Sequence, residues 1–254
     1  MKPSTTQESA LSKVPEVTLL FWVLKIVATT LGETGGDAVS MSMNLGYLVG
    51  TAIFGAIFVV AVVVQIRARS FHPVIYWLTI VATTTVGTTM ADFCDRSLGI
   101  GYAGGSLILL VLLITSLVAW RYTLGTISVE SVSTPRAEAF YWTTIMFSQT
   151  LGTALGDWTA DSEGMGYLTS ALLFGGLLAI LAGLHYFTQV NSTALFWAAF
   201  VLTRPLGAVV GDFLDKPHSE GGLELSRYVA SAVLVAFMAG GIAFFSHRPA
   251  RQSH

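Results

Sequence analysis

One pattern recurs four times along the chain: a tryptophan, a glycine ten positions later, and an aspartate five positions after the glycine. The tryptophans are Trp22, Trp77, Trp142 and Trp197, the glycines are Gly32, Gly87, Gly152 and Gly207, and the aspartates are Asp37, Asp92, Asp157 and Asp212. Self-similarity at a fixed spacing is the signature of a repeat architecture. Each copy is followed by a second apolar run, so the repeating unit is expected to hold two segments.

The apolar residues fall in runs long enough to cross a membrane. Hydrophobic residues make up 53% of the 254 residues and charged residues only 11%, whereas a soluble domain carries about 25% charged residues. A spanning helix needs roughly 20 mostly apolar residues. Suitable runs are residues 17–38, 46–66, 74–94, 102–120, 139–158, 166–187, 194–213 and 228–246. Because these runs lack the alternation of a β-barrel, they predict an all-α polytopic membrane protein with eight transmembrane helices.

The tryptophan spacing predicts two halves of two repeats each. Successive tryptophans are 55, 65 and 55 residues apart. The expected segments are an arm (1–16), a first half (17–120, repeats 17–70 and 74–120), a linker (121–138), a second half (139–247, repeats 139–190 and 194–247) and a tail (248–254). The arm is polar and is expected to be loose, without a signal peptide. Because each repeat has two spans, all four repeats should point the same way.

Positive residues predict the orientation of the chain. The expected tryptophan side carries Lys2, Lys13, Arg67, Arg69, Arg121, Arg136, Arg248 and Arg251, and the aspartate side carries Arg96, Lys216 and Arg227. The positive-inside rule then places both termini in the cytoplasm and the aspartates outward. No basic stripe points to nucleic acid, and the single Cys94 excludes an internal disulfide. The expected partner is the lipid bilayer, with no organic cofactor, and the oligomeric state is left open.

Positions 7, 11 and 15 residues after each tryptophan share one helix face. They are Thr29, Glu33, Asp37, Thr84, Thr88, Asp92, Gln149, Thr153, Asp157, Arg204, Ala208 and Asp212. A polar stripe facing lipid would be costly, so these stripes are expected to face the bundle interior and to line a pathway. The alternative is that the threonines only bond their own helix backbone. Lys25, in the first run, either snorkels to the interface or acts with Arg204 as a counter-ion.

Each stripe ends in two carboxylates about one helical turn apart. The pairs are Glu33/Asp37, Asp92/Asp95, Asp157/Asp161 and Asp212/Asp215, and Glu163, Glu220 and Glu224 lie in the same segments. Converging carboxylates can hold a hard cation or share a proton. An oxygen-only ligand set favours Mg²⁺, Ca²⁺ or Mn²⁺ over Zn²⁺ or copper. The alternative is that the aspartates only end helices or order turns near the outer interface.

The repeated small residues and tryptophans are expected to have structural roles. The small residues Gly32, Gly36, Gly87, Gly152, Gly156, Gly207 and Gly211 are spaced for close helix packing. The four tryptophans are expected to anchor the cytoplasmic interface, with a pore-lining role as the alternative.

With these tryptophans and Gly-x-x-x-small-Asp motifs, residues 17–247 resemble a bacterial family of uncharacterised membrane proteins titled "membrane-anchored protein". That family is built from four tandem two-span repeats of unknown function, so the resemblance implies the fold and no activity. The residues themselves favour a secondary transporter of a hard divalent cation, with Mn²⁺ as one candidate and proton exchange as one form of coupling. The alternative is a non-transporting scaffold or sensor. An enzyme is least expected because no nucleophile–base arrangement stands out.

Overall fold

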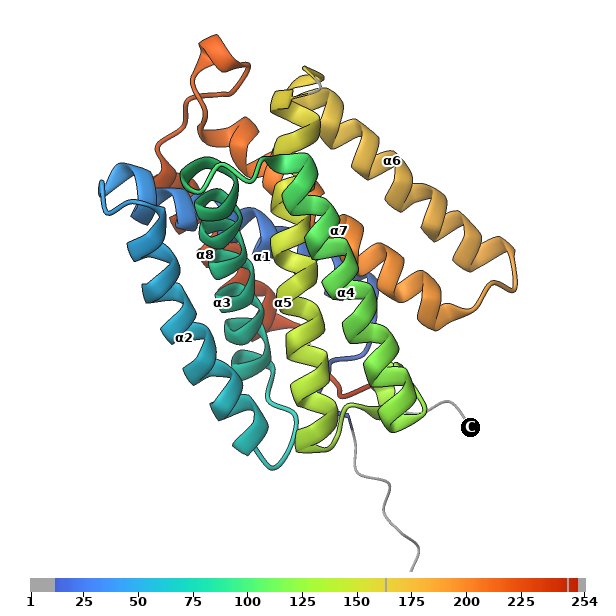
Figure 1. Cartoon of the computed structure of the whole chain (residues 1–254). Helices are drawn as coiled ribbons and strands as arrows, with labels where there is room; N and C mark the ends of the chain where they lie inside the picture. The colour runs from blue at the N-terminus through green and yellow to red at the C-terminus, as the bar shows by residue number, and fades with distance from the viewer. Residues whose placement is uncertain (1–11, 163, 246, 251–254) are drawn as a thin grey trace, which may run out of the picture.

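The computed structural model describes residues 12–162, 164–245 and 247–250, and this part of the chain forms a bundle of eight α-helices (Figure 1). The helices are α1 (Leu19–Asp37), α2 (Tyr47–Arg67), α3 (Pro73–Asp92), α4 (Tyr102–Leu124), α5 (Pro135–Asp157), α6 (Gly166–Phe187), α7 (Ser192–Asp215) and α8 (Arg227–Phe244). Each helix matches one of the apolar runs to within a few residues. The all-α class and the two-helix repeat are therefore confirmed.

The first three repeats turn outward after their aspartate in the same way. A π-helical turn follows each aspartate directly: η1 (Ala38–Ser42), η2 (Phe93–Ser97) and η4 (Trp158–Ser162). In the fourth repeat α7 instead continues to Asp215, and a short 3-10 turn, η5 (His218–Glu220), lies in the insertion before α8. The next helix starts at a glycine with a φ of 78° at Gly46 and Gly101 and 73° at Gly166. A side chain is strained at such angles, which explains the glycine of each Gly-Tyr pair.

The first helices of the four repeats form an inner ring. Helix α1 packs against α3 and α7, and α5 also packs against α3 and α7. The ring therefore closes between the first and fourth repeats. Since α3 packs on α5 just as α1 packs on α3, the middle of the chain is not a boundary in space, and the expected division into two halves is not seen. The connection between α4 and α5, which contains η3 (Val129–Ser131), packs Val129 and Val132 into the core.

The second helices lie outside the ring, each on the inner helix of the following repeat. Helix α2 packs on α3, α4 on α5, α6 on α7, and α8 returns to α1. Every repeat thus shares its packing surface with the next one. No repeat can bury its apolar face alone, which is the general behaviour of repeat proteins.

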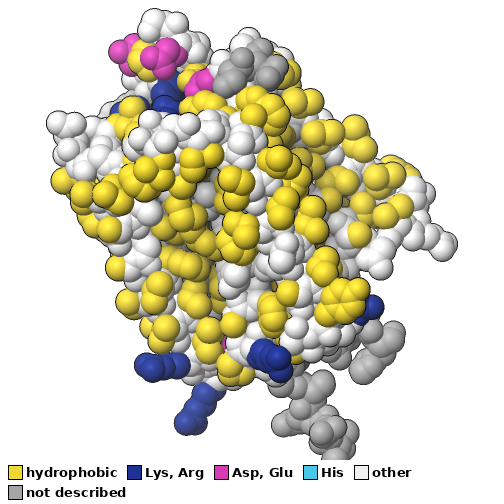
Figure 2. Space-filling model, viewed as in Figure 1, with side chains coloured by type: hydrophobic (Ala, Val, Ile, Leu, Met, Phe, Trp, Pro, Cys, Tyr) yellow, Lys and Arg dark blue, Asp and Glu magenta, His cyan; other side chains and the backbone are white. Residues whose placement is uncertain are grey.

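Six helices, α2, α3, α4, α6, α7 and α8, have the length and hydropathy of membrane spans, within the described residues. Helices α1 and α5 are as long but fall short in hydropathy because they carry more polar side chains. The outer helices expose large apolar side chains such as Ile57, Leu107, Leu172 and Val233. Figure 2 shows the resulting hydrophobic band around the middle, with Lys and Arg at one end and Asp and Glu beside further Lys and Arg at the other.

The described part of the N-terminal arm is packed, which corrects the expectation of a loose segment. The main-chain N–H of Lys13 donates to the carbonyl of Val132 at 2.8 Å, and Ala250 donates to Val14 at 2.8 Å. The Lys13 ammonium lies 2.6 Å from the Glu138 carboxylate in a buried ion pair. Lys2, Glu163, Arg251 and the rest of the arm and tail lie outside the described residues.

Candidate functional site

Eight aromatic side chains close the inner ring at the end where the described terminal segments meet. Each repeat contributes its tryptophan and the residue before it: Phe21–Trp22, Tyr76–Trp77, Tyr141–Trp142 and Phe196–Trp197. The earlier member packs on the tryptophan of the next repeat, with centroids 5.6 Å apart for Phe21 and Trp77 and 5.7 Å for Tyr76 and Trp142. The circle continues at 6.2 Å from Tyr141 to Trp197 and closes at 5.7 Å from Phe196 to Trp22. We call these eight residues the aromatic ring.

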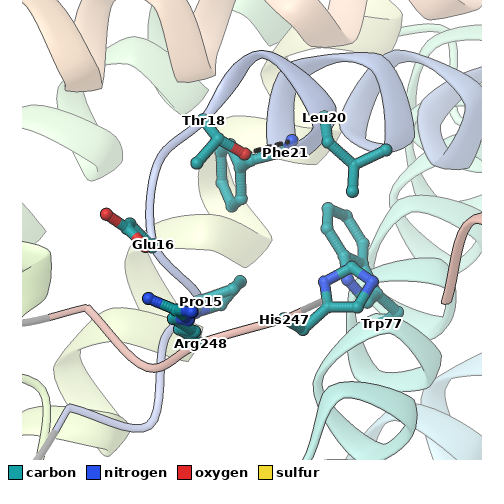
Figure 3. Close-up of a pocket in the computed structure, with 8 residues that line it drawn as sticks. All are labelled: Pro15, Glu16, Thr18, Leu20, Phe21, Trp77, His247 and Arg248. Carbon is teal, nitrogen blue, oxygen red and sulfur yellow. Dashed lines mark hydrogen bonds between the residues drawn. The ribbon is translucent and has the colours of Figure 1, made fainter. Parts of the chain in front are cut away.

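The aromatic ring corrects the expectation that the tryptophans anchor a membrane interface. Trp77, Trp142 and Trp197 are at most 4% exposed, and Trp22 is half-buried. Figure 3 shows a small pocket against Phe21 and Trp77, on the side that the terminal segments cover. The sequence signal was the aromatic residue before each tryptophan, because an aromatic pair repeated four times suits a packed cluster better than single interfacial anchors.

The repeated glycines hold the inner helices close together. The glycine ten residues after each tryptophan faces the residue that lies seven positions after the tryptophan of the next repeat. Gly32 thus faces Thr84, Gly87 faces Gln149, Gly152 faces Arg204 and Gly207 faces Thr29. A Cβ on Gly87 would lie 3.1 Å from the Gln149 main-chain carbon. One helical turn later, the next glycine of three repeats faces the residue eleven positions after the neighbouring tryptophan: Gly36 faces Thr88, Gly156 faces Ala208 and Gly211 faces Glu33. These contacts give the inner ring a fourfold pseudo-symmetry and match the packing role expected of all seven glycines.

The polar stripes point into the centre of the inner ring. All twelve positions of the stripes are at most 3% exposed. The threonines bond within their own helix and across the ring. Thr88 Oγ1, for example, lies 3.2 Å from the carbonyl oxygen of Thr84 and 3.1 Å from that of Gly32 on α1. Likewise Thr29 Oγ1 lies 2.8 Å from its own-helix Ile26 carbonyl and 3.2 Å from the Thr203 carbonyl on α7.

Arg204 and Glu33 lie at the middle of this polar axis. The Arg204 guanidinium donates to the Glu33 carboxylate at 2.9 Å and to the Thr88 hydroxyl at 2.6 Å, and it also contacts Thr153. One guanidinium thus joins all four inner helices. Lys25 lies nearer the aromatic ring and is 0% exposed, so it does not snorkel. Its ammonium lies 3.5 Å from both Gln149 Oε1 and Thr203 Oγ1.

The carboxylates of all four repeats converge at the other end of the axis. Three sets have oxygen atoms within 4.8 Å of one another: Glu33, Asp157 and Asp212; Glu33, Asp37 and Asp92; and Asp37, Asp212 and Asp215. All six residues are buried. We call them the carboxylate cluster. The structure therefore brings together the four repeated aspartates that the sequence singled out, along with Glu33 and Asp215.

Two other predicted ligands lie at the edge of this cluster. Asp161 is partly exposed, with 38% of its side chain accessible, and lies 3.7 Å from Arg96. Asp95 is buried but faces the start of α4 near Gly105, and it takes part in none of the three oxygen sets. The π-helical turn explains this position, because it rotates the residues after Asp92 away from the ring axis.

Basic side chains of the protein fold back over the carboxylate cluster. Arg96 lies 2.9 Å from Asp92 and 3.4 Å from Asp157. Lys216 lies 3.0 Å from Asp37 and 3.2 Å from Asp212. Arg227 pairs with Asp215 at 3.1 Å and reaches Asp37 at 3.7 Å. Sequence reasoning counted these three residues only for membrane orientation and missed their role.

A sequence signal for two of these bases does exist. The second and fourth repeats carry the related stretches DFCDR (92–96) and DFLDK (212–216), whereas the first and third repeats read DAVSM and DWTAD. An acid and a base four residues apart lie on one helix face and can pair. Opposite repeats of the ring therefore supply the two bases. Because Arg96 and Lys216 come from opposite sides, they offset part of the negative charge of the cluster from both directions.

The aspartates do not act as helix caps in this structure. Neither Asp37 nor Asp92 makes a side-chain capping hydrogen bond to the π-helical turn that follows it. Among the described residues, the charged partners of Asp37, Asp92, Asp157 and Asp212 are Arg and Lys side chains. Asp37, Asp92 and Asp157 are nevertheless the last residues of α1, α3 and α5, so the alternative that the aspartates end helices stands beside the binding role.

Lys216 lies just beyond α7, and its neighbours stabilise the charged form of its ammonium. Burial alone lowers the pKa of its ammonium, but the neighbouring Asp212 and Asp37 carboxylates outweigh that effect and raise the pKa well above its usual value. The ammonium is thus charged throughout the physiological pH range. The arrangement is a buried acidic cluster whose counter-charges, among the described residues, come from the protein's own Arg and Lys side chains.

Comparison with protein families supports the repeat assignment. A family model described as "Repeat of Unknown Function (DUF347)" matches residues 20–71, 75–126, 140–191 and 195–249. The same comparisons found no significantly similar curated protein and no significantly similar solved structure. The four matches each cover one two-helix repeat and together span most of the chain, so this protein belongs to the family defined by that repeat of unknown function.

Proposed function

We propose that the protein is an eight-span membrane protein that transports a cation through the carboxylate cluster. Helices α1 and α5 complete the inner ring with α3 and α7, which have the character of membrane spans. Their polar residues, such as Thr29 and Gln149, are buried in the ring and need not meet lipid. This burial reconciles their lower hydropathy with a spanning position, because helices hide polar groups inside a bundle.

The proposed orientation places the aromatic ring on the cytoplasmic side. Arg67, Arg69, Arg121 and Arg136 are exposed on the connections at that end. Cytoplasmic loops carry an excess of Lys and Arg, so this end belongs inside the cell and the carboxylate cluster faces outward. The membrane of this proposal is the bacterial inner membrane, and both termini are cytoplasmic.

The observation that carries the proposal is the convergence of carboxylates from all four repeats within the bundle. Buried ionisable groups among membrane helices mark ion pathways and proton relays. Carboxylate oxygens within 4.8 Å of one another fit a hard divalent cation such as Mg²⁺ or Mn²⁺. Mn²⁺ is the first ion to test. No catalytic role is proposed.

The protein's own bases support transport rather than permanent metal binding. Lys216 and Arg96 pair with the same carboxylates that would bind the ion. An incoming cation has to displace these bases, and a departing cation lets them return. Such a competition offsets part of the negative charge of the empty site and gives the site two states, as a carrier requires. Protons can compete for the same oxygens, which makes proton exchange a natural form of coupling.

The proposal can be tested by measuring cellular metal content. Cells that express the wild-type protein would be compared by mass spectrometry with cells that express the Asp37→Asn/Asp92→Asn/Asp157→Asn/Asp212→Asn variant at equal membrane abundance. A change in one metal that the variant abolishes would support transport and identify the ion. The matched control is Glu220→Gln, because Glu220 is exposed in the loop at the same end of the protein.

The second candidate function is a membrane scaffold or sensor. The observation that favours it is the continuous packing of the aromatic ring, which leaves that end of the inner helices closed. If the quadruple variant folds and no metal content changes, the cation-transport proposal fails and this alternative gains. Uptake of ⁵⁴Mn²⁺ into proteoliposomes that contain the purified protein distinguishes the same two functions outside the cell.

A further inference from the structure

The inner half of the polar axis holds a buried lysine amine that has no carboxylate partner among the described residues. Lys25 is completely buried between α1, α5 and α7, and no carboxylate among the described residues lies within 4 Å of its ammonium. Arg204, the next charge along the axis, is already paired with Glu33. Among the described residues, a protonated Lys25 therefore has no ion-pair partner of its own. A charge taken out of water in this way is costly unless it is paired.

The groups around Lys25 hold it only weakly. The two acceptors nearest its ammonium, Gln149 Oε1 and Thr203 Oγ1, are 3.5 Å away, at the outer limit of a hydrogen bond. The ammonium also lies 4.1 Å from the centre of the Phe200 ring. A single aromatic face offsets only part of the lost hydration of an ammonium.

Hydrogen-bond donors are in excess in the same region. Arg204 Nε, Arg204 Nη1 and Gln149 Nε2 are buried and have no acceptor among the described residues. The hydroxyls of Thr84 and Ser148 are also buried and have no hydrogen-bond partner within the described part of the chain. At the other end of the axis, the described atoms without a hydrogen-bond partner include acceptors, the carboxylate oxygens Asp157 Oδ1 and Asp215 Oδ1. Native proteins seldom leave such groups unsatisfied, so each set points to a ligand.

We propose that Lys25, Arg204 and Gln149 form a binding site for a small monovalent anion on the axis of the inner ring. Lys25 supplies the charge that the anion neutralises, and the free N–H groups of Arg204 and Gln149 donate to it. A protonated Lys25 carries one charge, which suits a monovalent anion. The enclosure by four helices limits the ligand to a few atoms, such as chloride, nitrate or formate. The site adjoins the carboxylate cluster through the Arg204–Glu33 pair, and the proposal does not depend on cation transport.

The test measures anion binding to the purified protein in detergent. Thermal unfolding would be followed while chloride, nitrate or formate replaces gluconate at constant ionic strength, and binding of radiolabelled chloride would be measured by equilibrium dialysis. The wild type should show a saturable rise in Tm and stoichiometric chloride binding. Lys25→Met should lose both responses, since it keeps the length of the side chain and removes its charge. In gluconate that variant should be at least as stable as the wild type, because an unpaired buried charge is gone.

Two control variants show whether the anion response belongs to Lys25. Lys13→Met removes another buried lysine, one that has a carboxylate partner in Glu138, and it should keep the full anion response. The quadruple aspartate variant should also keep it, because those residues lie in the outer half. No chloride binding by the wild type, or an undiminished response in Lys25→Met, would overturn the proposal. Failure of cation transport alone would leave it standing.

Discussion

Arg204 and Glu33 join the fourth repeat to the first at the centre of the bundle, with Nη2 2.9 Å from Oε2 and both side chains buried. The two residues are 171 positions apart in the sequence, so their pairing closes the inner ring. Breaking a buried ion pair by removing one partner strands the other charge. Closure of the inner ring therefore depends on residues from both the first and the fourth repeat.

Arg204→Met should destabilise the protein by about 3–5 kcal/mol, because it leaves the Glu33 carboxylate buried without its partner. Adding Glu33→Gln should recover part of the lost stability. The double variant should therefore lose about 0.5–3 kcal/mol less unfolding free energy than the two single variants lose together. SDS-induced unfolding in mixed micelles measures both effects. Strict additivity would mean that the two side chains are not energetically coupled.

The glycine contacts predict a sharp contrast between two substitutions. Gly207→Ala should cost about 1–3 kcal/mol, because its Cβ would press on Thr29 and would lie 2.9 Å from the Thr29 main-chain carbon. Gly35→Ala is the matched control, since a Cβ there meets nothing within 4 Å. That change should be neutral or stabilising by up to about 1 kcal/mol through helix propensity. Equal effects on the unfolding midpoint would contradict the packing described for the inner ring.

The aromatic ring gives a third prediction. Trp77→Ala should destabilise the protein by about 3–5 kcal/mol, as expected when a large buried side chain is removed. The control is Tyr122, which is 87% exposed in the last turn of α4, at the same end of the protein as the aromatic ring. Tyr122→Ala should change the unfolding free energy by less than about 0.5 kcal/mol. Interfacial anchoring, in contrast, would give both aromatic residues small and similar effects on the folded fraction recovered from membranes.

Much of the fold could be predicted because it depends on local pattern. Runs of apolar residues near 20 positions long locate a helix whatever its neighbours are, and the spacing from tryptophan to aspartate places the polar side chains on one face. What the sequence could not show is which helix packs on which. The return of α8 to α1 depends on ring closure, which no single repeat contains. The long linker suggested two halves, yet its buried residues Val129 and Val132 belong to the core.

The sequence pointed to the acidic residues of the candidate site but not to the basic residues that pair with them. Carboxylates that recur at one position stand out by repetition, whereas Arg96 and Lys216 occur in only two repeats and Arg227 in one. A hydropathy reading treats a base near the end of a span as a marker of topology. Only the path of the chain after each aspartate shows that these side chains bend back onto the cluster. The tryptophans failed for a related reason, because aromatic residues near a helix end suit an interface and a packed cluster equally well.

The competition between Lys216 and an incoming metal ion yields the last prediction. The Lys216 ammonium lies 3.0 Å from Asp37 and 3.2 Å from Asp212, two oxygens of one candidate ligand set. Two unit charges about 4 Å apart near a protein surface interact by about 4 kcal/mol, so removal of this ammonium should raise divalent-ion affinity by about tenfold or more. Lys216→Gln is therefore expected to bind Mn²⁺ and Mg²⁺ more tightly than the wild type in calorimetric titrations, and to gain more Tm when either metal is added. Lys13→Gln, which alters a lysine at the opposite end, should leave metal affinity unchanged. If Lys216→Gln bound metal no better than the wild type, Lys216 would be a structural counter-ion, and the displacement step of the proposed transport cycle would have to be abandoned.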